Sequence, residues 1–202
     1  MINGFDEQIW WLVARAGGVV ALILVAASVL WGLLLSSKYL DGGPKPKGLL
    51  HLHRYLGGLS VLFTGIHLLG LYLDSYIQFT VAELLVPFVS TWRPGAVAAG
   101  VVSFWFLIAV QGTSTMMRHL PRRFWKWIHL TSYLLLPLGV LHGIIAGTDA
   151  SETWYRLGSG ALIGLLAWLT AWRAWRVPAR KRAAGQTAEQ QEALVASAGA
   201  LG

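Results

Sequence analysis

Residues 51–73 read HLHRYLGGLSVLFTGIHLLGLYL, a long apolar stretch in which His53 and His67 stand 14 residues apart. On a helix this spacing is about 21 Å, most of the roughly 30 Å thickness of a membrane's hydrocarbon core. A second apolar stretch holds His129 and His142, 13 residues or about 20 Å apart. Two such helices running in the same direction would place one imidazole pair near each membrane face. The pattern predicts two haems stacked across a membrane, as in a transmembrane electron path.

The composition is typical of a helical membrane protein. Of the 202 residues, 55% are hydrophobic and 12% are charged, about half the charge of a soluble domain. The net charge of +7 could indicate a nucleic-acid partner, but the basic residues lie between apolar segments and not in one patch. We therefore expect them to set the membrane topology, with lipid and not nucleic acid as the partner. The chain has no cysteine, so a thiolate-bound cluster is excluded and histidine is the candidate ligand for a redox cofactor.

We expect an all-α integral membrane bundle of five spans, because five apolar stretches approach the roughly 20 residues that a crossing needs. The intervening segment 77–90 is apolar but short and contains Pro87, so we expect it to lie in the outer interface. The predicted spans are Trp11–Leu35, Leu49–Tyr72, Pro94–Met117, Phe124–Ala146 and Trp154–Trp172.

The charges of the connections predict the orientation. The first and third connections and the segment after the last span are basic, whereas the second and fourth contain acidic residues. The positive-inside rule then places the N-terminus outside and the C-terminus in the cytoplasm of a multi-pass protein of the cell membrane. His53 and His129 would lie near the cytoplasmic face, and His67 and His142 near the outer face. We expect residues 1–176 to form the membrane domain and residues 177–202 a disordered cytoplasmic tail.

A single histidine in a membrane helix is often a hydrogen-bonded packing residue. Four histidines in two similar spacings favour haem ligation instead, because neutral imidazole is a common iron ligand and polar groups at membrane depth are costly. By the same reasoning His51 and His119, which lie outside this pattern, are expected to be interfacial side chains.

The two spacings differ in helical phase. At about 100° per residue, 14 residues leave His53 and His67 on one stripe, whereas 13 residues leave His129 and His142 about 140° apart. Pro137 lies between the second pair and could kink or rewind the span. Haems entering from different sides would also satisfy the pattern.

Basic side chains near the cytoplasmic ends of the histidine spans are candidate partners for haem propionates, because the arginine fork suits carboxylates. The candidates are Arg54, Arg118 and Arg122, which equally could only anchor the topology. Arg15, at the outer end of the first span, either snorkels toward water, which we expect, or faces the edge of the outer haem.

The sequence lacks the residues that several other functions would need. No Asp or Glu lies inside a predicted span, so a carboxylate proton relay is not expected. No His-x-x-x-His or Glu-x-x-His pair suggests a zinc or di-iron site, and no G-x-G-x-x-G in a strand–helix setting suggests a flavin or nicotinamide site.

Several short segments together resemble the ferric-reductase-like transmembrane domain of NADPH oxidases, ferric reductases and the haem-bearing membrane subunit of the periplasmic methionine sulfoxide reductase system. The resemblance spans roughly residues 15–175. Its motifs are His53-Arg54-Tyr55-Leu56-Gly57 leading to His67, Thr113-Ser114, the basic turn 118–123, Trp127-Ile128-His129, Tyr133 and His142-Gly143.

The resemblance implies two haems b, with His53 and His129 binding the cytoplasmic-side haem and His67 and His142 the outer one. It also makes Tyr133 a candidate cofactor contact. The chain departs from NADPH oxidases in lacking their flavin and NADPH domains, and from the sulfoxide reductase subunit in retaining both histidines of span two. It is most similar to short stand-alone bacterial members, which implies a separate cytoplasmic flavin reductase and an extracytoplasmic flavin-bearing acceptor.

The sequence therefore predicts electron transfer from a cytoplasmic reductase or quinol to an extracytoplasmic acceptor, as the membrane subunit of an oxidoreductase. One alternative is a quinone-coupled cytochrome b that oxidises superoxide or quinol. Another is a non-catalytic haem-binding scaffold or carrier.

Overall fold

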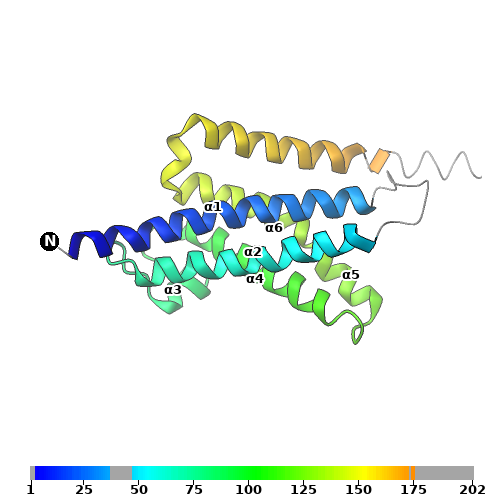
Figure 1. Ribbon diagram of the computed structural model, residues 1–202, viewed down its shortest axis with the longest axis horizontal. Coiled ribbons are helices and arrows are strands. Elements are labelled where there is room, and N and C mark those ends of the chain that lie inside the picture. The colour runs from blue at the N-terminus through cyan, green and yellow to red at the C-terminus, as the bar shows by residue number, and fades with distance from the viewer. Residues whose placement is uncertain (1–2, 37–46, 173, 176–202) are drawn as a thin grey trace, which may run out of the picture. The chain divides into compact units, whose positions relative to one another are not determined.

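The computed structural model describes residues 3–36, 47–172 and 174–175, and the described residues contain helices and turns but no strand. Residues 153–172 form a helix beyond the labelled ones. The labelled elements are α1 Asn3–Ser36, α2 Lys47–Leu73, α3 Val81–Leu85, α4 Pro94–Thr115, α5 Arg122–Leu130, α6 Ser132–Ala146 and the 3₁₀ turn η1 Thr148–Ser151 (Figure 1).

The chain divides into two compact units, Met1–Ile163 and Gly164–Gly202. The four predicted ligand histidines all lie in the first unit. The proposed tail, residues 177–202, lies outside the described residues, as does most of the basic first connection.

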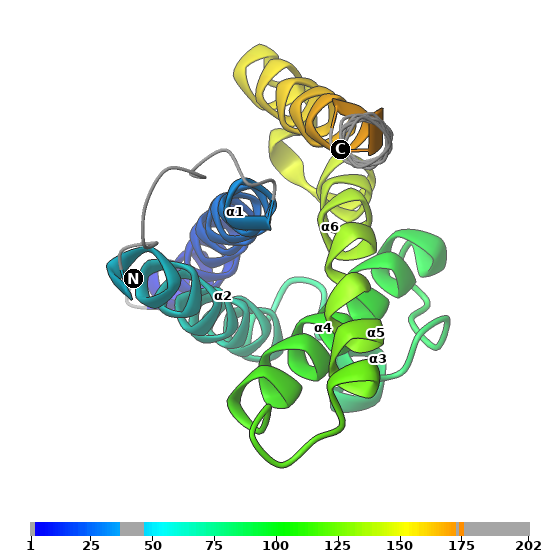
Figure 2. The same cartoon turned by 90° about the vertical axis from the view of Figure 1, so that its right-hand side faces the viewer.

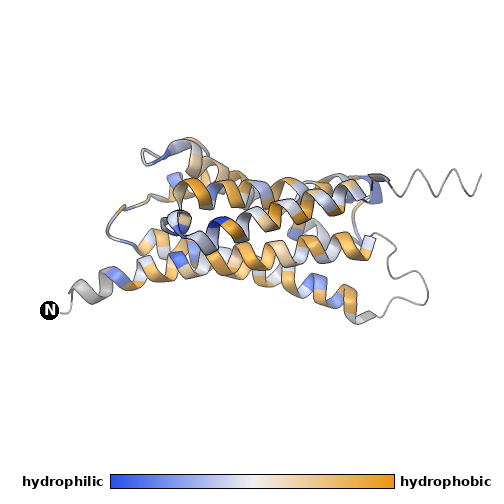
Figure 3. Ribbon diagram, turned by 90° about the horizontal axis from the view of Figure 1, so that it is seen from above, coloured by the Kyte–Doolittle hydropathy of each residue, from blue (hydrophilic) through white to orange (hydrophobic). Residues whose placement is uncertain are grey.

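Four helical stretches of the described chain are long and apolar enough to cross a membrane: Gln8–Ser36, Gly48–Leu73, Pro94–Thr115 and Arg122–Ala146. Apolar residues dominate along these stretches in Figure 3. They correspond to the first four predicted spans, which confirms an all-α membrane bundle. The helix at 153–172 occupies the place of the fifth span but is not among the four, so a fifth crossing stays a prediction.

The first unit is built from two antiparallel helix pairs. α1 packs along α2, and α4 packs against α6, with further contacts of α1 with α6 and of α2 with α4 (Figure 2). In Figure 1, α2 and α6 both run from right to left. The two histidine-bearing spans therefore run in the same direction, as the spacing argument requires.

The α1–α2 pair is held close by glycine. A Cβ atom added at Gly70 of α2 would lie 2.6 Å from the backbone nitrogen of Ala14 on α1, and one at Gly17 would lie 3.0 Å from the backbone nitrogen of His67. Small residues at such contacts let two backbones approach, which is how membrane helices gain packing energy without a hydrophobic driving force. The same close approach brings the α1 backbone within reach of the α2 side chains.

The fourth span is broken at Thr131, between α5 and α6, and not at Pro137, which lies inside α6. Around the break, some backbone hydrogen bonds join residues three positions apart, as in a 3₁₀ helix. Thr131 N–H donates to Ile128 O at 3.0 Å, and Leu134 N–H donates to Thr131 O at 2.9 Å. A 3₁₀ step turns about 120° instead of 100°, so each one reduces the expected 140° offset between His129 and His142 by about 20°. These shortened steps lie six residues before Pro137, the residue at which the sequence suggested a change of phase.

The connection between α2 and α4 folds as a compact segment that contains the short helix α3. Phe79 and Leu84 are buried with Val97 and Val101 of α4, and Trp92 packs edge-on against Phe79. A five-residue helix cannot span a bilayer, in agreement with the expectation for segment 77–90; its place in the outer interface stays a prediction.

A capping box begins α3. The Thr80 N–H donates to the Glu83 carboxylate at 2.9 Å, its hydroxyl donates to the same oxygen at 2.8 Å, and the Thr91 N–H donates to the other oxygen at 3.2 Å. The backbone bond from Thr80, followed by its hydroxyl, holds the pKa of the Glu83 carboxyl below its ordinary value of 4.5. The charged form therefore stabilises this connection.

Adding a methyl group at Gly70 should separate α1 from α2. We expect Gly70→Ala to destabilise the protein by about 1–3 kcal/mol through overpacking, measured as a lower thermal midpoint in detergent. Gly65→Ala, at a position of α2 with open space around it, is the matched control and should be neutral or slightly stabilising. Equal midpoints for the two variants would contradict the close contact.

The capping box should make the α3 segment sensitive to acid. Because the folded-state pKa of Glu83 is lowered, its contribution is complete above about pH 4.5 and is lost as the pH falls through the folded-state value. Hydrogen exchange of the α3 amides in Glu83→Gln, compared with wild type at each pH, should be faster at neutral pH and converge with wild type in acid. A difference that does not change with pH would rule out this role for the carboxylate.

Candidate histidine-pair site

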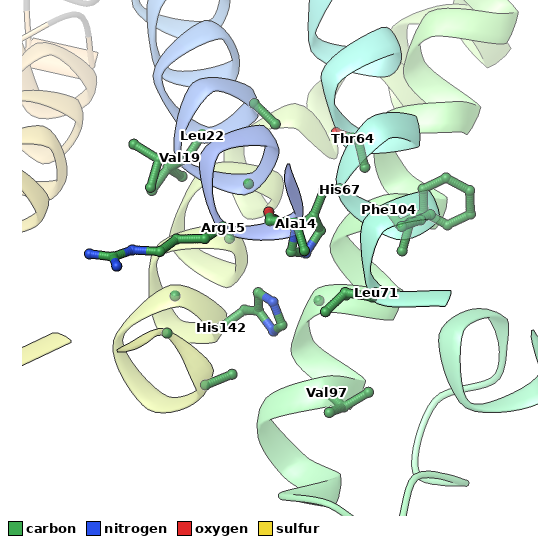
Figure 4. A pocket seen from close by; sticks show the side chains of 18 of the residues that line it. Ala14, Arg15, Val19, Leu22, Thr64, His67, Leu71, Val97, Phe104 and His142 are labelled. Atoms are coloured by element: carbon green, nitrogen blue, oxygen red, sulfur yellow. Dashed lines mark hydrogen bonds between the residues drawn. The ribbon is translucent and has the colours of Figure 1, made fainter. Parts of the chain in front are cut away.

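The structure brings the four predicted histidines together in the two expected pairs. The ring centroids of His67 and His142 are 6.2 Å apart with an angle of 79° between the ring planes, and Figure 4 shows the two rings approaching each other. The centroids of His53 and His129 are 6.1 Å apart with an angle of 74°. Each pair joins a residue of α2 to one of the fourth span, so two similar sites lie one above the other along α2.

Three of the four imidazoles are fixed by a backbone carbonyl of a neighbouring helix. The Nδ1 atom of His67 lies 2.6 Å from Ala14 O, that of His53 lies 3.0 Å from Ser28 O, and that of His142 lies 2.8 Å from Ala96 O. A carbonyl can only accept, so Nδ1 must carry the hydrogen. The Nε2 atom is then the unprotonated nitrogen, which is the form that binds a metal.

Each of these carbonyls is followed four residues later by a glycine that packs against the same ring. A Cβ atom at Gly18 would lie 2.9 Å from His67 Nδ1, one at Gly100 would lie 2.7 Å from His142 Nδ1, and one at Gly32 would lie 3.0 Å from His53 Cε1. We call this arrangement, a carbonyl with a glycine four residues later, a carbonyl seat. The absent side chain leaves room for the ring to reach the helix backbone.

Sequence reasoning missed these glycines, although a signal was present. Gly18 and Gly32 are 14 residues apart on α1, the same spacing as that of His53 and His67 on α2. Two antiparallel helices with equal repeats would bring each glycine to one histidine.

His129 has a different environment. Its Nδ1 lies 3.5 Å from the hydroxyl oxygen of Ser114, the outer limit for a hydrogen bond. Its ring stacks on Trp125, with centroids 4.9 Å apart and an angle of 26° between the planes, and the Trp125 Nε1–H points to the same Ser114 oxygen at 3.5 Å.

A cavity of about 460 Å³ surrounds the His67–His142 pair. This volume is within the range of small-molecule and cofactor sites. Its wall is mostly apolar, with side chains from α1, α2, α4, α6 and the α3 connection, among them Leu22, Leu68, Phe104 and Trp92.

Arg15 borders this cavity and forms an ion pair with Asp149 of η1, donating to both of its carboxylate oxygens. Asp149 is buried, and the Arg15 guanidinium also lies 5.1 Å from the centre of the Trp11 ring. The Arg15 side chain is 39% exposed, so the ion pair leaves the expectation that it snorkels toward water standing as a prediction. The pair joins α1 to the turn that follows α6, which the sequence could not show because the partners are 134 residues apart.

A second carboxylate, that of Asp74, also borders the cavity. It is 5% exposed, and one oxygen accepts from Ile77 N–H at 3.3 Å. The other oxygen is buried and has no hydrogen-bond partner within the described part of the chain.

The other candidate residues lie near the His53–His129 end. Arg54 is exposed beside His53, Arg118 and Arg122 are exposed in and after the turn that links α4 to α5, and Tyr133 is half-buried in the first turn of α6. Contact of these four with a cofactor stays a prediction. His51 and His119 are exposed and belong to neither pair.

The comparison with protein families matches residues 17–140 to the ferric reductase like transmembrane component. The match covers more than half of the chain, including His53, His67 and His129, and ends two residues before His142. The chain belongs to this family. Comparisons with curated proteins and with solved structures gave no match.

Membership confirms the resemblance of the sequence motifs. With the four apolar stretches, it makes this ferric-reductase-like chain a multi-pass membrane protein and indicates a membrane electron-transfer component that works with lipid and separate redox partners.

The geometry of this ferric-reductase-like site fits haem. Two metal–nitrogen bonds of about 2 Å and about 1.1 Å from each ring centre to its nitrogen total roughly 6.2 Å, close to the 6.1 and 6.2 Å between centroids. Within the described residues there is no group of three or more His, Cys, Asp or Glu that could hold a metal ion. Two opposed imidazoles per site are therefore best matched by a cofactor that brings its own in-plane ligands.

Breaking the Arg15–Asp149 pair should loosen α1. We expect Asp149→Asn to lower the free energy of unfolding by about 1–2 kcal/mol, because it weakens charged hydrogen bonds of a partly exposed arginine. The measurement is the thermal midpoint in detergent. Glu152→Gln, an exposed neighbour, is the control, and the pair would be unimportant if both variants unfolded at the same temperature.

Proposed function

We propose that the protein carries single electrons across a membrane through two haems b, one between His53 and His129 and one between His67 and His142. The observation that carries the proposal is the presence of two opposed imidazole pairs with nearly equal separations. Membership of the ferric reductase like family supports it independently. Each haem would supply a one-electron ferric–ferrous couple.

The residues of the chain would hold the haems, orient their histidine ligands and enclose the His67–His142 site. The carbonyl seats fix Nδ1 as the protonated nitrogen of His53, His67 and His142, which leaves Nε2 as the nitrogen that would bind iron. Each haem would be held by two histidines and would supply one-electron transfer, without a substrate bound to its iron. The wall of the cavity around His67 and His142 is mostly apolar, which suits the porphyrin of a haem.

The spacing of the histidines along α2 sets the distance between the two haems. His53 and His67 are 14 residues apart on the unbroken α2, or about 21 Å. The two haems together would therefore extend across most of the membrane thickness. With the N-terminus outside and a fifth span at 153–172, the His53–His129 haem is the inner one. Arg54, Arg118 and Arg122 would then bind propionates or anchor this end in the cytoplasm.

The direction that we propose is from a cytoplasmic flavin reductase or a quinol to an extracytoplasmic acceptor, such as a flavin-bearing protein. The motifs of the chain offer no flavin or nicotinamide site, so the donor would be a separate molecule of the cell. Acting with it, the chain would be the membrane subunit of an oxidoreductase in the cell membrane.

One observation favours a second candidate, a cytochrome that oxidises quinol. The carboxylate-bearing residue Asp74 borders the His67–His142 cavity, and a carboxylate is the kind of group that accepts a hydrogen bond from a quinol hydroxyl. Haem reduction by a quinol with no flavoprotein present would favour this function over the reductase-driven one.

The test is the haem content of histidine variants. Purified wild type should contain two low-spin b haems per chain, counted as the pyridine haemochrome and seen in the dithionite-reduced minus oxidised spectrum. His53→Ala should lose one haem and His142→Ala the other, because each removes one axial ligand. His51→Ala, two residues from His53 and exposed, is the matched control and should keep both.

Other outcomes of this experiment would contradict the two-haem path or favour another function. Wild type with one haem or none, or ligand variants that retain both, would contradict the two-haem path. Haem that exchanges readily at low occupancy would instead support a carrier or scaffold.

A further inference from the structure

The four histidines differ in the helix residue against which each ring packs. For His67, His53 and His142 this residue is a glycine, four positions after the carbonyl that accepts the Nδ1 hydrogen. For His129 the residue is Ser114, which lies 14 positions after Gly100 on α4, the same repeat as on α1. Ser114 thus occupies the place of the fourth glycine.

A serine at this place changes what the ring can reach. The carbonyl four residues earlier belongs to Val110, the counterpart of Ala14, Ser28 and Ala96 in the other three seats. No bond from His129 to a backbone carbonyl occurs among the described residues; its Nδ1 has only the Ser114 hydroxyl, at 3.5 Å. The other three distances are 2.6, 2.8 and 3.0 Å, so His129 makes the weakest of the four bonds.

Trp125 approaches the same Ser114 oxygen. It lies four residues before His129 on α5 and so shares a helix face with it. Its indole N–H points to the Ser114 oxygen at 3.5 Å, and its ring stacks on the imidazole. Two donors thus share one hydroxyl oxygen, and the stack holds the His129 ring without any backbone acceptor among the described residues.

We propose that Ser114 is a positioning residue that denies His129 a carbonyl partner and so raises the reduction potential of the His53–His129 haem above the value that a fourth glycine would give. This inference rests on the proposed function. It concerns a residue that would touch neither iron nor substrate and would act through the ligand alone.

The physical reason lies in the charge of the imidazole. An Nδ1–H that donates strongly to a carbonyl makes the ring a better electron donor to iron, which stabilises the ferric state and lowers the potential. A weak partner has the opposite effect. The His67–His142 site has two carbonyl partners and the His53–His129 site has one, so this effect holds an electron more tightly at the His53–His129 haem.

The experiment is a redox titration of the full-length protein in detergent, with Ser114→Gly and Ser114→Ala compared with wild type. Glycine opens the path to the Val110 carbonyl, whereas alanine removes the hydroxyl but keeps the Cβ atom. We expect Ser114→Gly to lower the potential of one haem, shifting electron sharing between the haems about tenfold, or about 59 mV for a one-electron couple. Ser114→Ala should not lower it.

The His67–His142 haem of the same molecule is the internal control, because the carbonyl seats of its two histidines are unchanged. Repeating the titration in a His142→Ala background leaves the His53–His129 haem alone and assigns the shift. Trp125→Phe is an independent variant: it removes the competing N–H, frees the hydroxyl for His129 and should lower the same potential by less than Ser114→Gly.

Two haems with unchanged potentials in Ser114→Gly and Trp125→Phe would overturn the role of Ser114 while leaving the proposed function intact. Equal lowering in Ser114→Gly and Ser114→Ala would also overturn it, because the effect would then come from the lost hydroxyl and not from a carbonyl seat. A wild-type protein without two haems would instead overturn the proposed function itself.

Discussion

An imidazole inside a membrane needs an acceptor for its ring N–H, because no bulk water is available there, and this need accounts for much of the packing. The acceptors are carbonyls of helices that already bond internally, so the ring must approach a helix backbone closely. Gly18, Gly32 and Gly100 permit that approach, and Gly70 brings α1 near enough to α2. α1 contains no histidine, yet it orients two of the four rings.

The sequence was sufficient to predict the first four spans and which histidines lie close to each other. Apolar runs of about 20 residues have few alternatives to membrane helices, and a spacing of 14 on one helix places two side chains on one stripe at a fixed distance. His53 therefore had to meet a residue at the same depth on a parallel span, and His129 was the available one.

The sequence could not reveal what depends on contacts between distant segments. The Arg15–Asp149 pair joins residues that no local pattern connects. The change of helical phase near Thr131 arises from a few shortened hydrogen-bond steps, whereas Pro137 was the more conspicuous residue. The glycines of the carbonyl seats were visible, but their meaning depends on which helix lies opposite.

The interruption of the fourth span has a consequence for how the two sites can vary. α2 is a single helix, so its two histidines move as one body and keep their separation. His129 and His142 belong to different helices, α5 and α6, joined at Thr131. A rotation of α5 would reorient one ring and leave the other in place. One ligand helix thus acts as a fixed spacer, while the other allows each site to be adjusted, and to evolve, separately.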